Sequence, residues 1–260
     1  MNILFLGDVV GSDAVSLLVN RLENIKSRYE TDFCIVNGEN ALANGINYTT
    51  AKRLLDAGAD VITLGNHTFS RYNDAVSMFV DYDLSVIRPL NYPPGVCGLG
   101  CKSFKAGDKS IVVVNLLGRA LMTQNVDCPF RTMDSLLRKT NSGSSYVFVD
   151  FHAETTSEKL AMLYHLDGRV CAIVGTHTHV PTADEKVSAK GTAYITDVGM
   201  VGPSDSIIGA NKDMVLQRFL TGISKRLGTS KSPIIMNAVL IRTDDNSTRA
   251  VEIRRICENI

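Results

Sequence analysis

The sequence predicts an α/β fold. Short apolar runs, read as buried strands, alternate with segments whose apolar residues recur at helical spacing. The first unit is an apolar strand at residues 2–6, followed by a segment with helical periodicity that runs to about Tyr29. Polar residues follow directly after several of the predicted strands, which is where open α/β sheets bind their ligands. The pattern therefore predicts a functional site at the C-terminal ends of the strands.

Composition and charge exclude several classes of protein. Hydrophobic residues make up 45% of the 260 residues and charged residues 21%, which is ordinary for a soluble globular protein. The absence of linkers, repeats and low-complexity runs predicts a single domain over residues 1–260. The formal net charge is zero, so extended nucleic acid and anionic membrane are not expected partners. No apolar stretch reaches the roughly 18 residues that span a bilayer.

The cysteines and the N-terminus indicate a cytoplasmic protein. The six cysteines are scattered along the chain, and two of them lie in apolar strand-like runs, so we expect reduced thiols. The first residues lack a basic leader and meet Asp8 early. They are therefore interpreted as a strand and not as a signal peptide.

Three predicted strands in the first half, at residues 2–6, 33–36 and 60–64, are each followed by polar side chains able to bind a metal ion. These side chains are Asp8 after the first strand, Glu39 and Asn40 after the second, and Asn66 and His67 after the third. Each loop alone is equally explained by turn or capping residues. Three such loops on one edge of one sheet predict a site.

The remaining elements of the first half are predicted from caps and turns. Ser12 or Asp13 is expected to cap the first helix, and Asn47 or Thr49 the second. Further helices are predicted at 73–80 and 129–139, and a hairpin of 101–106 with 110–116 around Gly107-Asp108. The Pro- and Gly-rich stretch at 87–95 is interpreted as a lid or wall of the site or, equally, as a rigid connector.

Two strands of the second half end in histidines. The strand at 146–152 ends at His152, and the apolar run at 170–174 leads into His177 and His179. Residues two apart at a strand end are expected to point to the same side of the backbone. His165 lies within a predicted helix and is interpreted as a surface or packing residue.

The second half is otherwise expected to be structural. Thr155 and Glu158 form a capping-box pattern before that helix. The segment at 192–200, a helix near 213–224 and strands at 234–242 and 249–256 complete the chain, and nothing after Gly209 has ligand spacing.

The set of candidate ligands combines imidazole, carboxylate and amide oxygen. Such a set suits Fe, Mn or Zn better than Ca or Cu(I). Two ions about 3.5–4 Å apart would clamp the attacking and leaving oxygens of a displacement at phosphorus.

Eight segments together resemble the calcineurin-like metallophosphoesterases and, more closely, the bacterial YmdB-like phosphoesterase family. The segments are Gly7-Asp8-Val9-Val10-Gly11, Asn37-Gly38-Glu39-Asn40-Ala41, Gly65-Asn66-His67-Thr68-Phe69, Arg88-Pro89-Leu90-Asn91-Tyr92, Asn115-Leu116-Leu117-Gly118-Arg119, Asp150-Phe151-His152-Ala153-Glu154, Gly175-Thr176-His177-Thr178-His179-Val180 and Ile195-Thr196-Asp197-Val198-Gly199-Met200. The resemblance implies a four-layer α/β/β/α sandwich of two sheets.

The resemblance also implies a role for each site residue. Asp8, Glu39, Asn40 and His179 would hold one divalent ion, and Glu39, Asn66, His152 and His177 the other, with Glu39 bridging. The ions would be Fe or Mn, with Zn as a third candidate. His67 would be a catalytic residue that is not a ligand. Arg88, Asn91 and Arg119 are secondary candidates for substrate contact, each with an ion pair within the fold as the alternative, and Asp150, Glu154 and Asp197 are candidates to orient the histidines.

The implied activity is hydrolysis of cyclic nucleotides, 2′,3′-cyclic AMP among them, by attack of a metal-bound hydroxide. The expected partner is a small phosphodiester, and a regulatory role and a homo-oligomer are left open. The alternatives are a phosphomonoesterase or nuclease, and a metal-bound nucleotide sensor with little turnover. The chain departs from the pattern of its wider or closer relatives at Val10, Ser12 and Ser70. None of these three is an inferred ligand.

Overall fold

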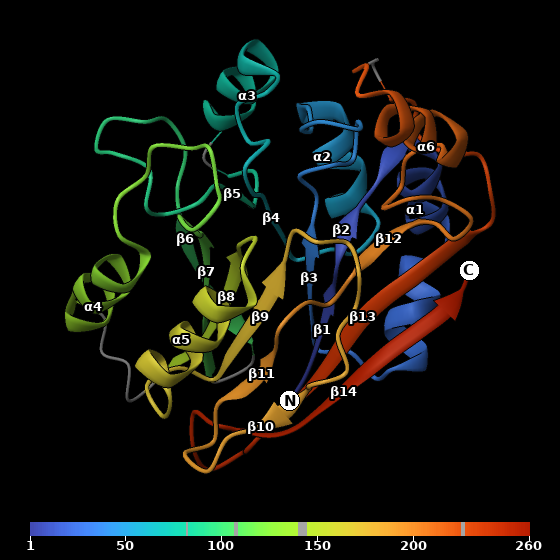
Figure 1. Cartoon of the computed structure of the whole chain (residues 1–260). Helices are drawn as coiled ribbons and strands as arrows, with labels where there is room; N and C mark the ends of the chain where they lie inside the picture. The colour runs from blue at the N-terminus through green and yellow to red at the C-terminus, as the bar shows by residue number, and fades with distance from the viewer. Residues whose placement is uncertain (82, 107–108, 140–144, 225–226) are drawn as a thin grey trace.

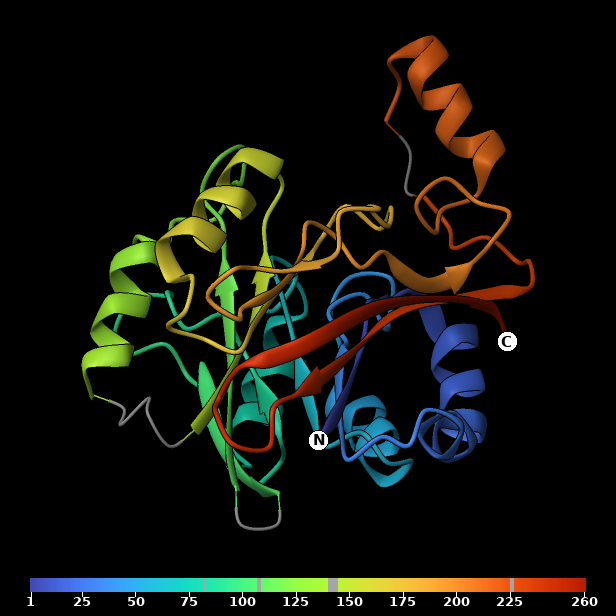
Figure 2. The ribbon, with the colours of Figure 1, turned by 90° about the horizontal axis from the view of Figure 1, so that it is seen from below.

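A computed structural model describes residues 1–81, 83–106, 109–139, 145–224 and 227–260. Two β-sheets pack face to face, and helices cover the outer face of each sheet (Figures 1 and 2). The four-layer α/β/β/α sandwich is therefore confirmed. The single domain expected over residues 1–260 stays a prediction.

The first sheet contains most of the strands that precede the predicted loops. Its order is β2-β12-β13-β1-β3-β4-β5, and β14 pairs with β13. Strands β1, β3, β4 and β5 run parallel, whereas β13 is antiparallel to its neighbours. The bounds are β1 Asn2–Leu6, β2 Asp8–Val9, β3 Phe33–Asn37, β4 Val61–Thr63, β5 Val86–Ile87, β12 Met200–Pro203, β13 Ile234–Thr243 and β14 Ala250–Asn259.

The second sheet has the order β10-β11-β9-β8-β7-β6. Strands β7, β8, β9 and β11 are parallel, so their C-terminal ends lie at one edge. The bounds are β6 Cys101–Ala106, β7 Lys109–Leu117, β8 Ser145–His152, β9 Ala172–Thr176, β10 Lys186–Val187 and β11 Ala193–Ile195.

Alternation along the strands creates the layers. Ile3 and Phe5 of β1 are buried between the two sheets, whereas Leu4 and Leu6 face the outer helices. This is the period-two pattern of a strand that is buried on both faces. Because apolar side chains fill both faces, the polar groups of the strands are left for the strand ends.

Among the described residues, five helices cover the sheets and a sixth projects from them. Helices α1 (Gly11–Arg28), α2 (Tyr48–Asp56) and α3 (Tyr72–Phe79) pack on the first sheet. Helices α4 (Pro129–Lys139) and α5 (Thr156–Leu166) pack on the second. Helix α6 (Lys212–Thr221) stands away from the layers in Figure 2. None of the described helices is long and apolar enough to cross a membrane.

Several local predictions need correction. Neither Ser12 nor Asp13 caps α1, because the helix already begins at Gly11 and its N-cap is Val10. Only half of the capping box forms. The Thr155 hydroxyl accepts from the Glu158 amide, but the Glu158 carboxylate accepts from the amides of Arg119 and Ala120. The predicted turn residues Gly107-Asp108 lie outside the described residues, although β6 and β7 pair as expected.

Candidate metal centre

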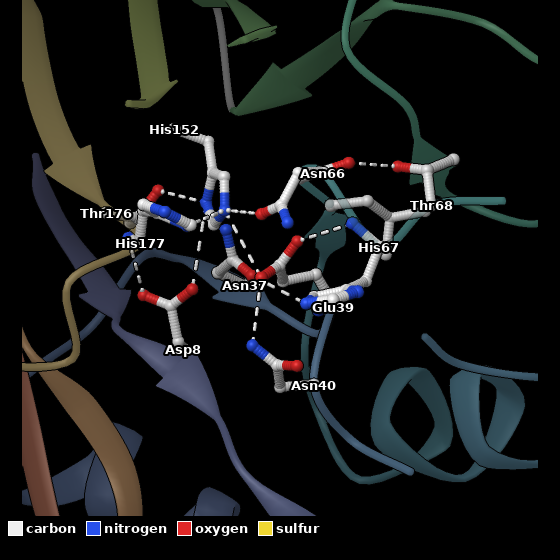
Figure 3. Close-up of polar contacts among 12 residues, drawn as sticks. Asp8, Asn37, Glu39, Asn40, Asn66, His67, Thr68, His152, Thr176 and His177 are labelled. Carbon is white, nitrogen blue, oxygen red and sulfur yellow. Dashed lines mark hydrogen bonds and ion pairs between the residues drawn. The ribbon is translucent and has the colours of Figure 1, made fainter. Parts of the chain in front are cut away.

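The C-terminal ends of strands from both sheets meet at one place, shown in Figure 3. The first sheet contributes the residues that follow β1, β3 and β4, and the second sheet those at the ends of β8 and β9. The side chains gathered there are Asp8, Glu39, Asn40, Asn66, His67, His152, His177 and His179. The structure therefore brings together the seven predicted ligands and the predicted catalytic histidine.

Potential ligand atoms form two groups that share one carboxylate. Glu39, His152 and His177 form one group, and Asp8, Glu39 and His179 form the other, with the ligand atoms of each group within 4.8 Å of one another. Asp8, Glu39 and His152 are fully buried. A carboxylate common to both groups is the arrangement that a bridging ligand requires.

His152 presents one ring nitrogen to the first group. Its Nε2 lies 2.9 Å from Oδ1 of Asn66, 3.0 Å from Nδ1 of His177 and 3.2 Å from Oε1 of Glu39. Four potential ligand atoms thus converge within hydrogen-bonding distance. A metal ion that displaces the proton of Nε2 could be bound by all four.

The other ring nitrogen of His152 is held by a hydrogen-bonded chain. Thr176 donates its hydroxyl hydrogen to Oδ1 of Asp150 at 2.7 Å, and its oxygen lies 2.9 Å from Nδ1 of His152. Because the hydroxyl has only one hydrogen, Nδ1 of His152 must be the donor to it. Nδ1 of His152 therefore keeps its hydrogen in either charge state, and Nε2 is the nitrogen that a metal ion can bind once its proton has left.

Asp150 in turn accepts hydrogen bonds from Asn37 and Thr63, so three buried neutral donors hold it. Thr63 and Thr176 were not singled out by the sequence reasoning. Their signal was a threonine at the last position of an otherwise apolar strand.

His179 is oriented in the same manner by the backbone. Its Nδ1 lies 2.8 Å from the carbonyl oxygen of Ile208, so Nδ1 donates and Nε2 carries the lone pair. The Asn40 amide nitrogen lies 3.1 Å from that Nε2 and donates to Oε1 of Glu39 at 2.8 Å. Ligation by the Asn40 oxygen requires a rotation of the amide that exchanges its two ends.

The backbone around His177 and His179 differs from the expected extended strand. Strand β9 ends at Thr176, and both histidines have positive φ angles, 106° for His177 and 65° for His179. Positive φ is costly for residues other than glycine. The expectation that an extended strand continues through both histidines is therefore wrong. Both still line one cavity, and each belongs to a different one of the two ligand groups, as the family resemblance implied.

Burial and neighbouring charges shift the pKa values of the cluster. Burial raises the pKa of Asp8 to about 6, although His152 and His179 lower it. Burial would also raise the pKa of Glu39, but His152 lowers it to about 2. Burial would lower the pKa of His152, and Glu39 and Asp8 raise it to about 9. Burial and His152 lower the pKa of His177 to about 3. A proton on His152 thus provides positive charge that these buried carboxylates require.

Two observations test whether divalent ions fit. Oδ1 of Asp8 is buried and accepts no hydrogen bond from the described residues, which is costly unless a cation binds it. A Cβ atom at Gly65 would lie 2.3 Å from Oε2 of Glu39 and 2.4 Å from Nε2 of His152. Only glycine leaves the space around these two ligand atoms open. The residues present therefore fit a metal centre.

A buried ion pair anchors the loop that contains both histidines. Nζ of Lys159 on α5 lies 2.8 Å from Oδ2 of Asp197, and both side chains are buried. Asp197 also accepts hydrogen bonds from the amides of Thr178 and Gly199. Lys159 was missed by the sequence reasoning. Its signal is its spacing with the apolar Met162, Leu163 and Leu166, which places it on the buried face of α5.

His67 lies beside the cluster and lines the cavity that opens from it. Its backbone amide donates to Oε2 of Glu39, and its Nδ1 lies 3.0 Å from Oγ of Ser70. The ring is half-buried, and the hydrogen bond at Nδ1 leaves Nε2 available to a bound molecule.

A model of the family described as "YmdB-like protein" matches residues 4–256 of this chain. The chain belongs to the YmdB-like family. It is similar to a protein from Bacillus subtilis (strain 168) named 2′,3′-cyclic-nucleotide 2′-phosphodiesterase, with 42% identity over 100% of this chain and 97% of that protein.

Two solved structures resemble this YmdB-like protein over its full length. The crystal structure of a hypothetical protein from Thermus thermophilus has 38% sequence identity and a TM-score of 0.91, and the match covers 100% of this chain and 99% of that one. The crystal structure described as a novel phosphatase from Mycoplasma pneumoniae has 36% identity and a TM-score of 0.92, and the match covers 100% and 93% of the two chains.

The three secondary substrate candidates, Arg88, Asn91 and Arg119, do not line the cavity over the cluster. Three nitrogens of the Arg88 guanidinium donate to the carbonyl oxygens of Pro89, Val96 and Cys97. The Asn91 amide donates to two backbone carbonyls and accepts from the Leu117 amide. Arg119 is exposed and does not line the cavity. These contacts give Arg88 and Asn91 a role in holding the loop at 88–97, and the predicted role of the three residues in substrate contact stays a prediction.

Glu154 lies at the cluster, whereas His165 lies outside it. Oε2 of Glu154 lies 2.9 Å from Nε2 of His177, so Glu154 holds the ring nitrogen that faces away from His152. His165 pairs with Asp134 and packs against Phe130, as expected for a histidine outside the site.

Proposed function

We propose that this member of the YmdB-like family is a metal-dependent phosphodiesterase that hydrolyses 2′,3′-cyclic nucleotides. The observation that carries the proposal is the sharing of Glu39 between two groups of ligand atoms at the strand ends. The name of the B. subtilis relative, at 42% identity, supports the same class of substrate.

Seven side chains would hold two divalent ions, which we propose to be Fe or Mn, with Zn as the third candidate. Asp8, Glu39, Asn40 and His179 would bind one ion, and Glu39, Asn66, His152 and His177 the other. When bound, such a pair supplies positive charge at the phosphate oxygens and lowers the pKa of water. The protein contributes the orientation of the ligands, through Thr176 for His152 and the Ile208 carbonyl for His179.

His67 would act on the oxygen that leaves phosphorus. Nδ1 of His67 is held by Ser70, so Nε2 is the atom from which a proton passes to the leaving oxygen. Opening of the cyclic diester needs this proton because the leaving alkoxide is a strong base. General acid catalysis of this kind contributes about 10²–10⁴-fold to the rate.

The cavity supports a small-molecule substrate. It has a volume of about 1150 Å³ and opens directly over Glu39, His177 and His179. The zero net charge of the chain favours a small phosphodiester over extended nucleic acid. A cytoplasmic location and a homo-oligomer stay predictions.

Turnover of two substrates tests the proposal. We expect the protein, loaded with Mn, to hydrolyse 2′,3′-cyclic AMP to a nucleoside monophosphate faster than it hydrolyses 4-nitrophenyl phosphate. Hydrolysis of the monoester alone would contradict the proposal and would favour a phosphomonoesterase. Binding of the cyclic nucleotide without turnover would favour a sensor.

A further inference from the structure

The cavity over the cluster has two chemically different ends. Ligand atoms of Glu39, His177 and His179 line one end. The other end is built from a loop at residues 207–210 and from helix α6, and it includes the side chains of Ile208 and Phe219. Metal binding gives a function to the polar end only, and the apolar end has no function in the metal centre.

The loop that forms the apolar end is tied to a predicted ligand. Ile207 and Ala210 exchange two backbone hydrogen bonds, both of 3.0 Å, which close the loop. Between them, the Ile208 carbonyl accepts from Nδ1 of His179, while the Ile208 side chain stays half exposed at 52%. The apolar wall is therefore fixed relative to the centre through one hydrogen bond.

Helix α6 turns one of its faces to the same space. Val215, Arg218 and Phe219 line the cavity and are spaced three and four residues apart, so they share a face of the helix. Val215 is buried, but Phe219 is 81% exposed. Leu220 is equally exposed, at 84%, and does not line the cavity. An aromatic ring left exposed at the rim of a cavity is a surface that a planar ligand can cover.

We propose that the apolar end binds the nucleobase of the substrate, with the ring of Phe219 stacked on the base and Ile208 against its edge. The proposal rests on the proposed function, because it places the phosphate of the same molecule at the ligand cluster. Cavities of roughly 300–1,000 Å³ hold drug-sized ligands. The volume of about 1150 Å³ is thus ample for a nucleotide and far larger than a phosphate group needs.

The test compares Phe219→Ala with the matched control Leu220→Ala. Two cyclic diesters serve as substrates: 2′,3′-cyclic AMP, and glycerol 1,2-cyclic phosphate, which has no base. We expect Phe219→Ala to raise KM for the cyclic nucleotide about tenfold more than for the glycerol compound, because a base stacked on an aromatic ring loses that contact. Leu220→Ala should change KM for the two substrates by the same factor or leave both KM values unchanged. Phe219→Trp should restore the preference for the nucleotide.

A binding measurement separates this inference from the proposed activity. We expect calorimetric titration to show that Phe219→Ala weakens binding of 3′-AMP about tenfold and binding of inorganic phosphate far less. This result would support the base site even if neither cyclic compound were hydrolysed. The proposal would be overturned if Phe219→Ala weakened binding of 3′-AMP and of phosphate by the same factor. It would also be overturned if Phe219→Ala and Leu220→Ala weakened binding of 3′-AMP equally. The proposal would also be overturned if Phe219→Ala weakened binding of 3′-AMP and at the same time changed the molecular mass of the protein in solution.

Discussion

Thr176 is placed between Asp150 and His152 so that its hydroxyl hydrogen goes to the carboxylate and its oxygen faces the imidazole. The two distances are 2.7 Å to Oδ1 of Asp150 and 2.9 Å to Nδ1 of His152. Because the only hydrogen of the hydroxyl is donated to the buried Asp150, the hydroxyl oxygen must accept a hydrogen bond from Nδ1 of His152. The result is a His152 ring whose Nε2 faces Glu39, Asn66 and His177 and is the nitrogen that gives up its proton when a metal ion binds.

Thr176→Val keeps the shape of the side chain and removes this connection. We expect metal affinity to fall about 10–100-fold, the usual cost of losing a hydrogen bond that orients a ligand. Calorimetric titration with Mn measures the change. Thr192→Val is the matched control, since Thr192 is also buried and donates to a backbone carbonyl, but lies at the amino end of β11. If both variants lost metal affinity equally, the hydrogen bond between Thr176 and His152 would not be what orients the ligand.

His67→Ala should separate catalysis from metal binding. We expect kcat for 2′,3′-cyclic AMP to fall about 10²–10⁴-fold while the metal content stays that of the unaltered protein. The reason is that His67 contacts Glu39 through its backbone amide, which the substitution retains. Elemental analysis measures the metal content, and the kinetic assay measures kcat. If His67→Ala lost metal together with activity, His67 would not be the proposed proton donor.

Lys159→Met should destabilise the fold through Asp197. Removing one partner of a buried ion pair leaves the other charge uncompensated, which costs about 3–5 kcal/mol. Urea unfolding of the metal-free protein measures the free energy of unfolding. The double variant Lys159→Met with Asp197→Asn removes both charges, so we expect it to recover part of the loss. No recovery in the double variant would show that the charge of Asp197 is not the cause.

Metal binding should release a proton from His152. Its pKa is raised to about 9 in the metal-free centre, so His152 is protonated at pH 7.5, whereas Asp8, with a pKa of about 6, is ionised. A metal ion needs the lone pair of His152, so we expect His152 to contribute about one released proton at pH 7.5, and this contribution to fall toward zero as the pH rises through 9, while any release from metal-bound water remains. Calorimetry in buffers of different ionisation enthalpy counts the protons. His165→Gln serves as the control and should leave the count unchanged, whereas a release independent of pH would argue against this charge state.

The strand ends could be predicted from the sequence because their signals are local. Apolar runs that end in Asp8, Glu39, Asn66, His152 and His177 locate the site without any knowledge of the packing. The assignment of Asp8, Glu39, Asn40 and His179 to one ion was implied only by family resemblance. In the structure, Asp8, Glu39 and His179 form one of the two groups.

Other features depend on contacts between residues far apart in the chain. The Ile208 carbonyl reaches His179 across 29 residues, and Asn37 reaches Asp150 across 113. No local pattern signals such pairs. The positive φ angles of His177 and His179 occur in a loop, after the strand has ended at Thr176, so strand periodicity could not predict them. Arg88 was a candidate for substrate contact because arginine suits phosphate geometry, with an ion pair within the fold as the alternative, and only the loop carbonyls around it reveal its structural contacts.

An anomalous difference map from crystals grown with Mn tests the central claim most directly. We predict two peaks per chain about 3.5–4 Å apart, with Glu39 between them. One peak should be bound by Asp8, Asn40 and His179, and the other by Asn66, His152 and His177. A single peak, or two peaks that do not share Glu39, would contradict the account.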